Sequence, residues 1–207
     1  MPTTYNKVAG QSIERLAALS DGIFGVAMTL LVLEIHLPST GAVHSEHDLW
    51  RGLVALGPQL LAYGMSLVAL GIFWVGQQAQ LDHLARSDRH LTWIQIGFLF
   101  AVTLMPFSTK LLSEFPSYRT ALLAYWGNLA LLGGVLYGSW GYSTRTGLLK
   151  PGTPEQTVTA ICNRIVVAQG LYAFGALLCV FSTAWSIAFI ALVQVNYAVA
   201  PRFRSRR

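Results

Sequence analysis

One long apolar stretch near the start of the sequence contains polar side chains that can interact with cations. Residues 15–38 read RLAALSDGIFGVAMTLLVLEIHLP, so hydroxyl and carboxylate groups interrupt a hydrophobic run. Ionisable groups are costly at membrane depth and normally face protein or water instead of lipid. Hydroxyl oxygens can replace part of an ion's hydration shell, and carboxylates raise the local concentration of cations. These side chains are therefore candidates for helix packing or for contact with ions.

The residues of this stretch fall on two different faces if the segment is helical. At about 100° per residue, small and apolar residues with a single hydroxyl share one stripe. Ser20 and Asp21 point away from that stripe by well over about 90°. The stripe is either a packing face, with the threonine hydroxyl bonded to its own backbone, or the wall of a water-filled path; periodicity alone favours packing. Its members are Gly22, Val26, Thr29, Leu30, Leu33 and Leu37.

Helices of a membrane protein are the elements that must position these residues. The 207 residues are 54% hydrophobic and 11% charged, with a formal net charge of +5. A soluble domain carries about 25% charged residues, so this chain has too little polar surface to face water. The composition excludes disorder, a coiled coil and a soluble nucleic-acid-binding protein. It predicts an all-α bundle embedded in a bilayer, in which the positive charge reflects membrane topology.

Six segments are long and apolar enough to cross a bilayer, which takes about 20 residues each. If the N-terminus is placed inside, ten lysines and arginines fall in inside segments and three in outside segments. Cationic loops stay in the cytoplasm, so both termini are predicted to be cytoplasmic. Arg164 lies within the fifth segment and is not counted. The predicted spans of this single domain, residues 1–207, are 15–37, 49–77, 91–112, 118–142, 158–181 and 184–200.

Enzyme motifs are missing from the sequence. It has no glycine-rich phosphate loop, no G-x-S-x-G and no H-E-x-x-H, so we expect no catalytic residues, cofactor or metal site. A secondary transporter and a non-conducting structural membrane protein are the alternatives to a channel. Transporters tend to have repeated halves with broken helices. The sequence shows no repeat and predicts an unbroken first helix, which argues against a transporter.

Three motifs resemble those of the transmembrane protein 175 family. Residues 15–35 resemble its first-helix signature, R-x-x-x-F-S-D followed by an apolar run with I-T-L-L-V-L, although Leu19 replaces the phenylalanine. Residues 105–112, MPFSTKLL, are similar to the family's L-P-F-x-T-x-L-L. Phe73 and Trp74 are also typical of the family, but Gln77 and Gln78 stand where it often has a histidine pair.

The resemblance implies a potassium channel of the plasma membrane, built as a homotetramer around a central pore. Four first helices would line this pore, with constrictions five, eight and twelve residues after the motif aspartate. These positions are Val26, Thr29 and Leu33, on the stripe found by periodicity, and Leu30 shares the stripe. The agreement favours a pore over a packing face. Hydroxyl groups offer a weaker field than stacked carbonyls, so we expect a leak-type channel with modest preference for potassium over sodium.

The remaining polar residues of the first segment are expected to hold the assembly together. In the family, the serine and aspartate at Ser20 and Asp21 form a structural lock. Arg15 should find its partner on another helix, with Trp74 or the Gln77–Gln78 pair as candidates. Glu34 with His36 either concentrates cations at the outer mouth or is a packed or snorkelling carboxylate.

The expected partners are other copies of the chain, monovalent cations and membrane lipid, and no nucleic acid. The basic tail Arg202–Arg207 is typical of an anchor near anionic lipid.

Overall fold

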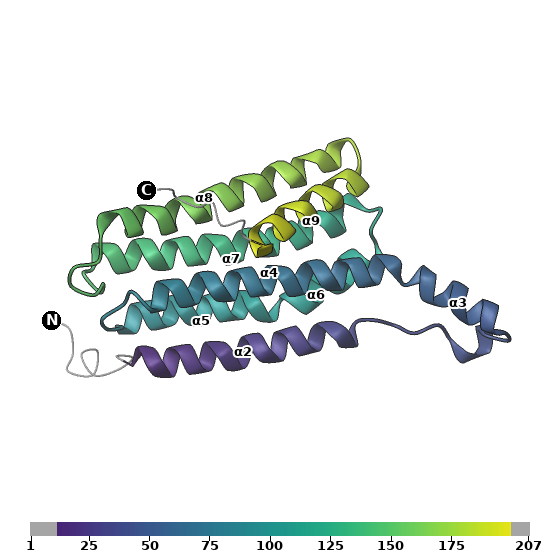
Figure 1. Cartoon of the computed structure of the whole chain (residues 1–207), viewed down its shortest axis with the longest axis horizontal. Coiled ribbons are helices and arrows are strands. Elements are labelled where there is room, and N and C mark those ends of the chain that lie inside the picture. The colour runs from purple at the N-terminus through teal and green to yellow at the C-terminus, as the bar shows by residue number, and fades with distance from the viewer. Residues whose placement is uncertain (1–11, 200–207) are drawn as a thin grey trace.

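The computed structural model describes residues 12–199, and within them it contains helices and no strand. The predicted all-α class is thereby confirmed. Most of the helices lie side by side along the long axis of the molecule, and α3 projects beyond one end (Figure 1). The elements are α2 (Ile13–Leu33), α3 (Glu46–Ala55), α4 (Gly57–Leu81), α5 (Arg89–Thr103), α6 (Met105–Glu114), α7 (Arg119–Arg145), α8 (Glu155–Leu177) and α9 (Thr183–Val199), with 3₁₀ turns at Thr40–Ala42 and Leu178–Val180.

Five helical segments of the described chain are long and apolar enough to cross a membrane. They are α2, α4, the joined pair α5–α6, α7, and α8 with its 3₁₀ turn. The last predicted span corresponds to α9, which is apolar but has only 17 residues. At about 1.5 Å per residue it is near the lower limit for a spanning helix. Residue 200, where this span was predicted to end, lies outside the described residues.

The first helix is shorter than predicted. Ser12 caps its start by accepting a hydrogen bond from the Arg15 N–H at 3.2 Å, and the helix ends at Leu33 instead of residue 37. Past that point the His36 N–H donates to the side chain of Gln59, 3.0 Å away, and not to the preceding helical turn. Pro38 also disfavours helical backbone angles at the preceding residue, Leu37. The segment 34–38 therefore leaves the helix axis.

Proline divides two of the predicted spans. The predicted span 49–77 is split at Leu56, where α3 ends and α4 begins with a proline in its first turn. The predicted span 91–112 is split at Leu104, before Pro106. Proline has no N–H to donate to the preceding turn, and its ring crowds that turn's carbonyl. Each of these spans is therefore two helices, and α4 runs on to Leu81 past the predicted end at residue 77.

Asn128 of α7 fills the break between α5 and α6. With its amide oriented to satisfy both neighbours, the nitrogen donates to the Ala101 carbonyl at 3.0 Å and the oxygen accepts from the Met105 N–H at 3.2 Å. In an uninterrupted helix these two backbone groups would bond each other. A side chain inserted into the ladder is a known cause of a kink. The break is therefore supported by the protein interior.

Helix α7 occupies the centre of the bundle. It packs against α5, α6 and α8, and Tyr125, Leu129 and Leu132 on α7 are fully buried. Helix α2 packs on α4, α5 and α6, whereas α8 packs on α7 and α9. Figure 1 shows α2 and α8 on opposite sides of the bundle.

The connections α4–α5 and α7–α8 meet at one end of the bundle, which we call the basic end. Helix α7 ends there at Arg145, and the φ of +67° at Gly147 lets the Leu148 N–H turn back to the Ser143 carbonyl at 3.1 Å. Leu148 in turn accepts from the Ala85 N–H at 2.9 Å, which joins the two loops. Arginine and lysine from both loops gather at this end. Lys7 and the tail Arg202–Arg207, counted with them in the sequence, lie outside the described residues.

Candidate functional site

Helix α2 buries one side of its surface and exposes the other. Its buried residues face α4, α5 and α6, and they recur at helical spacing along the whole helix. In the most hydrophobic part of this face, the Phe24 ring lies 6.0 Å from the Phe98 ring, centre to centre. The packing face of α2 within one chain consists of Leu16, Ser20, Phe24, Ala27 and Leu31.

The residues predicted to line a pore lie on the opposite side, and we call them the α2 stripe: Val26, Thr29, Leu30 and Leu33. Their side chains are exposed, with 57% exposure for Val26 and 71% for Leu33. Leu30 is 43% exposed and lies at the margin of the face. A Cβ added at Gly22, on the same side, would meet no atom within 4 Å. The α2 stripe therefore does not pack against the described part of its own chain.

The Thr29 side chain bonds to its own helix. Its hydroxyl donates to the Val26 carbonyl at 2.8 Å, as the packing interpretation of the sequence expected. A hydroxyl carries one proton and two acceptor lone pairs. Because the proton is directed back to the helix, the oxygen presents lone pairs to whatever faces the stripe. Such an oxygen can still contact a cation.

Asp21 is held by two donors from α4. Its Oδ1 accepts from the Trp74 indole N–H at 2.7 Å and from the Gln78 amide at 2.9 Å. Trp74 and the glutamine pair were expected as partners of Arg15, so this expectation is wrong: Trp74 and Gln78 bond Asp21. Arg15 forms no ion pair with another residue in the range 12–199.

Ser20 begins a chain of hydrogen bonds through the interior. Its hydroxyl donates to Gln77, whose amide donates to Gln95 at 2.8 Å. Gln95 in turn donates to the Ser139 hydroxyl at 2.7 Å. All four side chains are at most 2% exposed, so this polar chain connects α2, α4, α5 and α7 inside the bundle.

Sequence reasoning missed Gln95 and Ser139 as members of this network. Each is a polar residue within an otherwise apolar span, and that was the available signal. The signal does not name a partner, because Gln95 and Ser139 are 44 positions apart along the chain. The pair Gln77–Gln78, noted as a departure from the family's histidines, divides its bonds between Ser20 and Asp21.

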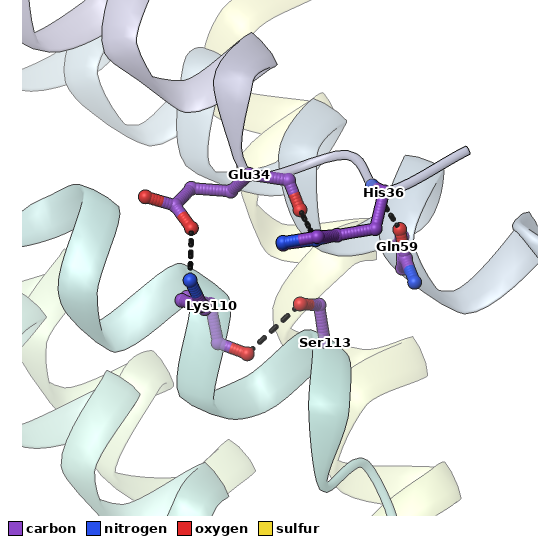
Figure 2. Close-up of polar contacts among 5 residues, drawn as sticks. All are labelled: Glu34, His36, Gln59, Lys110 and Ser113. Carbon is purple, nitrogen blue, oxygen red and sulfur yellow. Dashed lines mark hydrogen bonds and ion pairs between the residues drawn. The ribbon is translucent and has the colours of Figure 1, made fainter. Parts of the chain in front are cut away.

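The end of α2 opposite the basic end, which we call the outer end and which lies at Glu34, carries a different set of contacts (Figure 2). The Glu34 carboxylate forms an ion pair with Lys110 of α6 at 3.2 Å. The imidazole Nδ1 of His36 lies 2.9 Å from the Glu34 carbonyl, and its backbone N–H is bonded to Gln59. Lys110 neutralises the charge of Glu34 within the same chain. The geometry therefore favours the packed carboxylate over a free anionic ring.

The sequence of this chain is similar to that of a known protein family. The family described as the endosomal/lysosomal potassium channel TMEM175 matches residues 15–106, which include the α2 stripe and the Asp21 contacts. A potassium channel of Chamaesiphon minutus is 30% identical over 189 residues, covering 89% of this chain and 93% of that protein. A potassium channel of Streptomyces collinus is 32% identical over 139 residues, covering 65% and 66%.

A solved structure resembles the whole fold. It is the crystal structure of a lysosomal potassium-selective channel TMEM175 homolog from Chamaesiphon minutus. The superposition has a TM-score of 0.79 at 28% sequence identity, and it covers 92% of this chain and 98% of that chain. The likeness therefore extends well beyond the residues 15–106.

Proposed function

This chain belongs to the TMEM175 family and is a potassium channel, and we propose that α2 from each of four copies lines its pore. In this arrangement α9 is the sixth membrane crossing. The channel lies in the plasma membrane, and its basic end faces the cytoplasm. The gathering of cationic loops at one end supports this orientation, because such loops are retained in the cytoplasm.

The exposed α2 stripe is the observation that carries the proposal. Helix α2 is fixed by its opposite face and leaves the stripe unpartnered within the described chain. One helix cannot enclose a path by itself, so several copies must close around an axis. A closed cyclic homotetramer brings four equivalent stripes together.

The stripe would form alternating rings along the pore. Val26 and Leu33 are seven residues apart, about 10 Å along the helix axis, with Thr29 between them. Two apolar rings then flank a ring of four hydroxyl oxygens. Apolar rings narrower than a hydrated ion impose a dehydration barrier, and the hydroxyl oxygens replace part of the lost water. Leu30 contributes at the edge of the same rings.

Selectivity in such a pore is modest. Potassium sheds its water more readily than sodium, so partial coordination by hydroxyl groups favours potassium. The field of four hydroxyls is weaker than that of stacked carbonyls. The channel needs no cofactor, and conduction through it is passive and leak-type.

The secondary-transporter alternative is disfavoured by the break at Pro106. Transporters use the free backbone groups of broken helices to bind substrates and coupling ions. Here Asn128 occupies the groups freed next to that break. Helix α2 is continuous over its 21 residues. A non-conducting scaffold would not pass ions in liposomes, whereas the proposed channel would pass them without saturation.

Substitution of Thr29 tests the hydroxyl ring. Thr29→Ala removes the one polar group of the stripe, so potassium should lose part of its advantage over sodium. We would measure the reversal potential in planar bilayers under bi-ionic potassium and sodium. Thr103→Ala is the matched control, since Thr103 is also exposed and donates to its own helix, to the Phe100 carbonyl, at 2.8 Å.

The apolar ring is tested in the same bilayers. Leu33→Ala should raise the single-channel conductance and admit larger cations, because the dehydration barrier falls as the ring widens. The control is Leu192→Ala on α9, where the leucine is 67% exposed. If Thr29→Ala and Leu33→Ala behave like their controls, the stripe is a packing face. Native mass spectrometry that finds only monomers or dimers would contradict the four-subunit pore directly.

A further inference from the structure

A cavity of about 250 Å³ lies between α4 and α8, and Figure 1 shows α8 on the opposite side of the bundle from α2. Apolar cavities of about 150 Å³ bind small apolar molecules such as benzene. In a bilayer the abundant molecule of this kind is a lipid acyl chain. The apolar wall includes Ile72, Val75 and Gly76 of α4 and Ile161, Ile165 and Ala168 of α8.

An arginine borders this apolar cavity. Arg164 lines it, and its guanidinium carbon lies 5.8 Å from the centre of the Tyr197 ring. Arg164 is nine residues beyond the start of α8 at Glu155, about 13 Å along the axis. Among residues 12–199 no carboxylate lies within ion-pair distance of it. An arginine at this depth, without a countercharge from the described part of the chain, favours an anionic ligand.

A second polar residue, Tyr172, also borders the cavity. It is 1% exposed, lines the same cavity, and its hydroxyl has no hydrogen-bond partner in the part of the chain that the structure describes. Side chains on a helix lean toward its N-terminus, which for Tyr172 is the direction of Arg164. A buried hydroxyl without a partner is unfavourable, so an oxygen-bearing ligand would satisfy it.

We infer that the cavity binds an anionic phospholipid, with one acyl chain between α4 and α8 and the phosphate bonded to Arg164. Arginine bonds phosphate through two parallel N–H donors. Basic pockets between membrane helices on the cytoplasmic side commonly bind anionic head groups. The inference rests on the proposed function in one respect, namely that a central pore lined by α2 leaves α8 facing lipid.

Two other occupants fit the cavity less well. A second copy of the chain would have to approach the α8 side, whereas the proposed pore joins copies through α2. The segment 200–207 contains four arginines, so its positive charge would be repelled by that of Arg164. An anionic lipid agrees with both the charge of the site and the side of the bundle on which it lies.

Native mass spectrometry of the delipidated full chain tests this site. Phosphatidylglycerol and phosphatidylcholine with identical acyl chains are added separately, and the lipids retained per subunit are counted. We expect wild type to retain phosphatidylglycerol and to lose phosphatidylcholine. Arg164→Gln should weaken phosphatidylglycerol binding roughly fivefold. Arg164→Lys should restore most of it, and Arg86→Gln, an exposed arginine outside the cavity, should leave it unchanged.

Filling the cavity separates the acyl chain from the charge. Ala168→Phe keeps Arg164 but occupies the apolar space, so it should also reduce phosphatidylglycerol retention. Equal retention of both lipids, unchanged binding in Arg164→Gln or Ala168→Phe, or an equal loss in Arg86→Gln would overturn the site. The same spectra report the oligomer: tetramers that retain no phosphatidylglycerol contradict the lipid site alone, and monomers that retain it contradict the pore arrangement alone.

Discussion

The two ends of α2 are attached to the rest of the chain by different kinds of contact. At the basic end, Ser20 enters a fully buried hydrogen-bond network and Asp21 accepts two bonds from α4. At the outer end, Glu34 pairs with Lys110, whose side chain is 42% exposed. Buried networks fix a geometry because each unmade bond is costly. Exposed ion pairs contribute about 0–1 kcal/mol. The basic half of α2 is therefore firmly fixed, and the outer half around Leu33 has more freedom.

Removing Gln77 should have the largest effect on stability. Gln77→Leu leaves the Ser20 hydroxyl and the Gln95 carbonyl oxygen without their partners in the interior. Each unpaired buried group costs about 1–3 kcal/mol. We expect a clear drop in the thermal midpoint of the purified protein. Gln156→Leu on the exposed start of α8 is the control and should change little. If Gln77→Leu and Gln156→Leu lowered the thermal midpoint equally, the buried network would not fix the basic end of α2 more firmly than the outer end.

Substitution of Asp21 should have the second-largest effect on stability. Asp21→Ala leaves the Trp74 indole and the Gln78 amide without an acceptor, but both side chains are partly exposed and can reach other partners. We expect a loss of about 1 kcal/mol per subunit, read as lower tetramer yield by native mass spectrometry. Asp21→Asn keeps an acceptor oxygen and should recover most of the yield. Normal assembly of Asp21→Ala with altered ion selectivity would instead place Asp21 on the ion path.

Removal of the Glu34–Lys110 ion pair should have the smallest effect on stability. Lys110→Met removes the partner of Glu34 at a surface-accessible site, so we expect less than about 1 kcal/mol of destabilisation. High salt should weaken the wild-type pair and reduce the difference further. A thermal shift as large as that of Gln77→Leu would show that the outer end is as firmly fixed as the basic end.

The sequence predicted the parts of this molecule that depend on local pattern. The apolar runs predicted the membrane class and the all-α fold, and the motifs of residues 15–35 predicted the family. The 3.6-residue period separated the face of Val26 and Thr29 from that of Ser20 without any structure. The pore role assigned to the α2 stripe stays a prediction.

Contacts between distant segments were not predictable in the same way. The hydropathy of residues 91–112 predicts one continuous apolar span. It gives no sign of the break before Pro106, because that break is supported by a side chain from α7, far along the sequence. The partner of Trp74 was misassigned because a sequence gives the residues that need partners but not the rotation of one helix against another. Glu34 and Lys110 meet across 76 positions of sequence for the same reason.

The insertion of Asn128 between Ala101 and Met105 has a consequence for how the chain is made. The ribosome synthesises α5 and α6 before α7, so the bent segment reaches the membrane without the amide that completes it. Unsatisfied backbone groups in hydrocarbon cost several kcal/mol each. The bent segment is therefore expected to wait beside the translocation machinery until residue 128 has been added, and then to enter the lipid together with α7. Biogenesis of this protein would thus proceed by pairs of helices in its middle third and not by single spans.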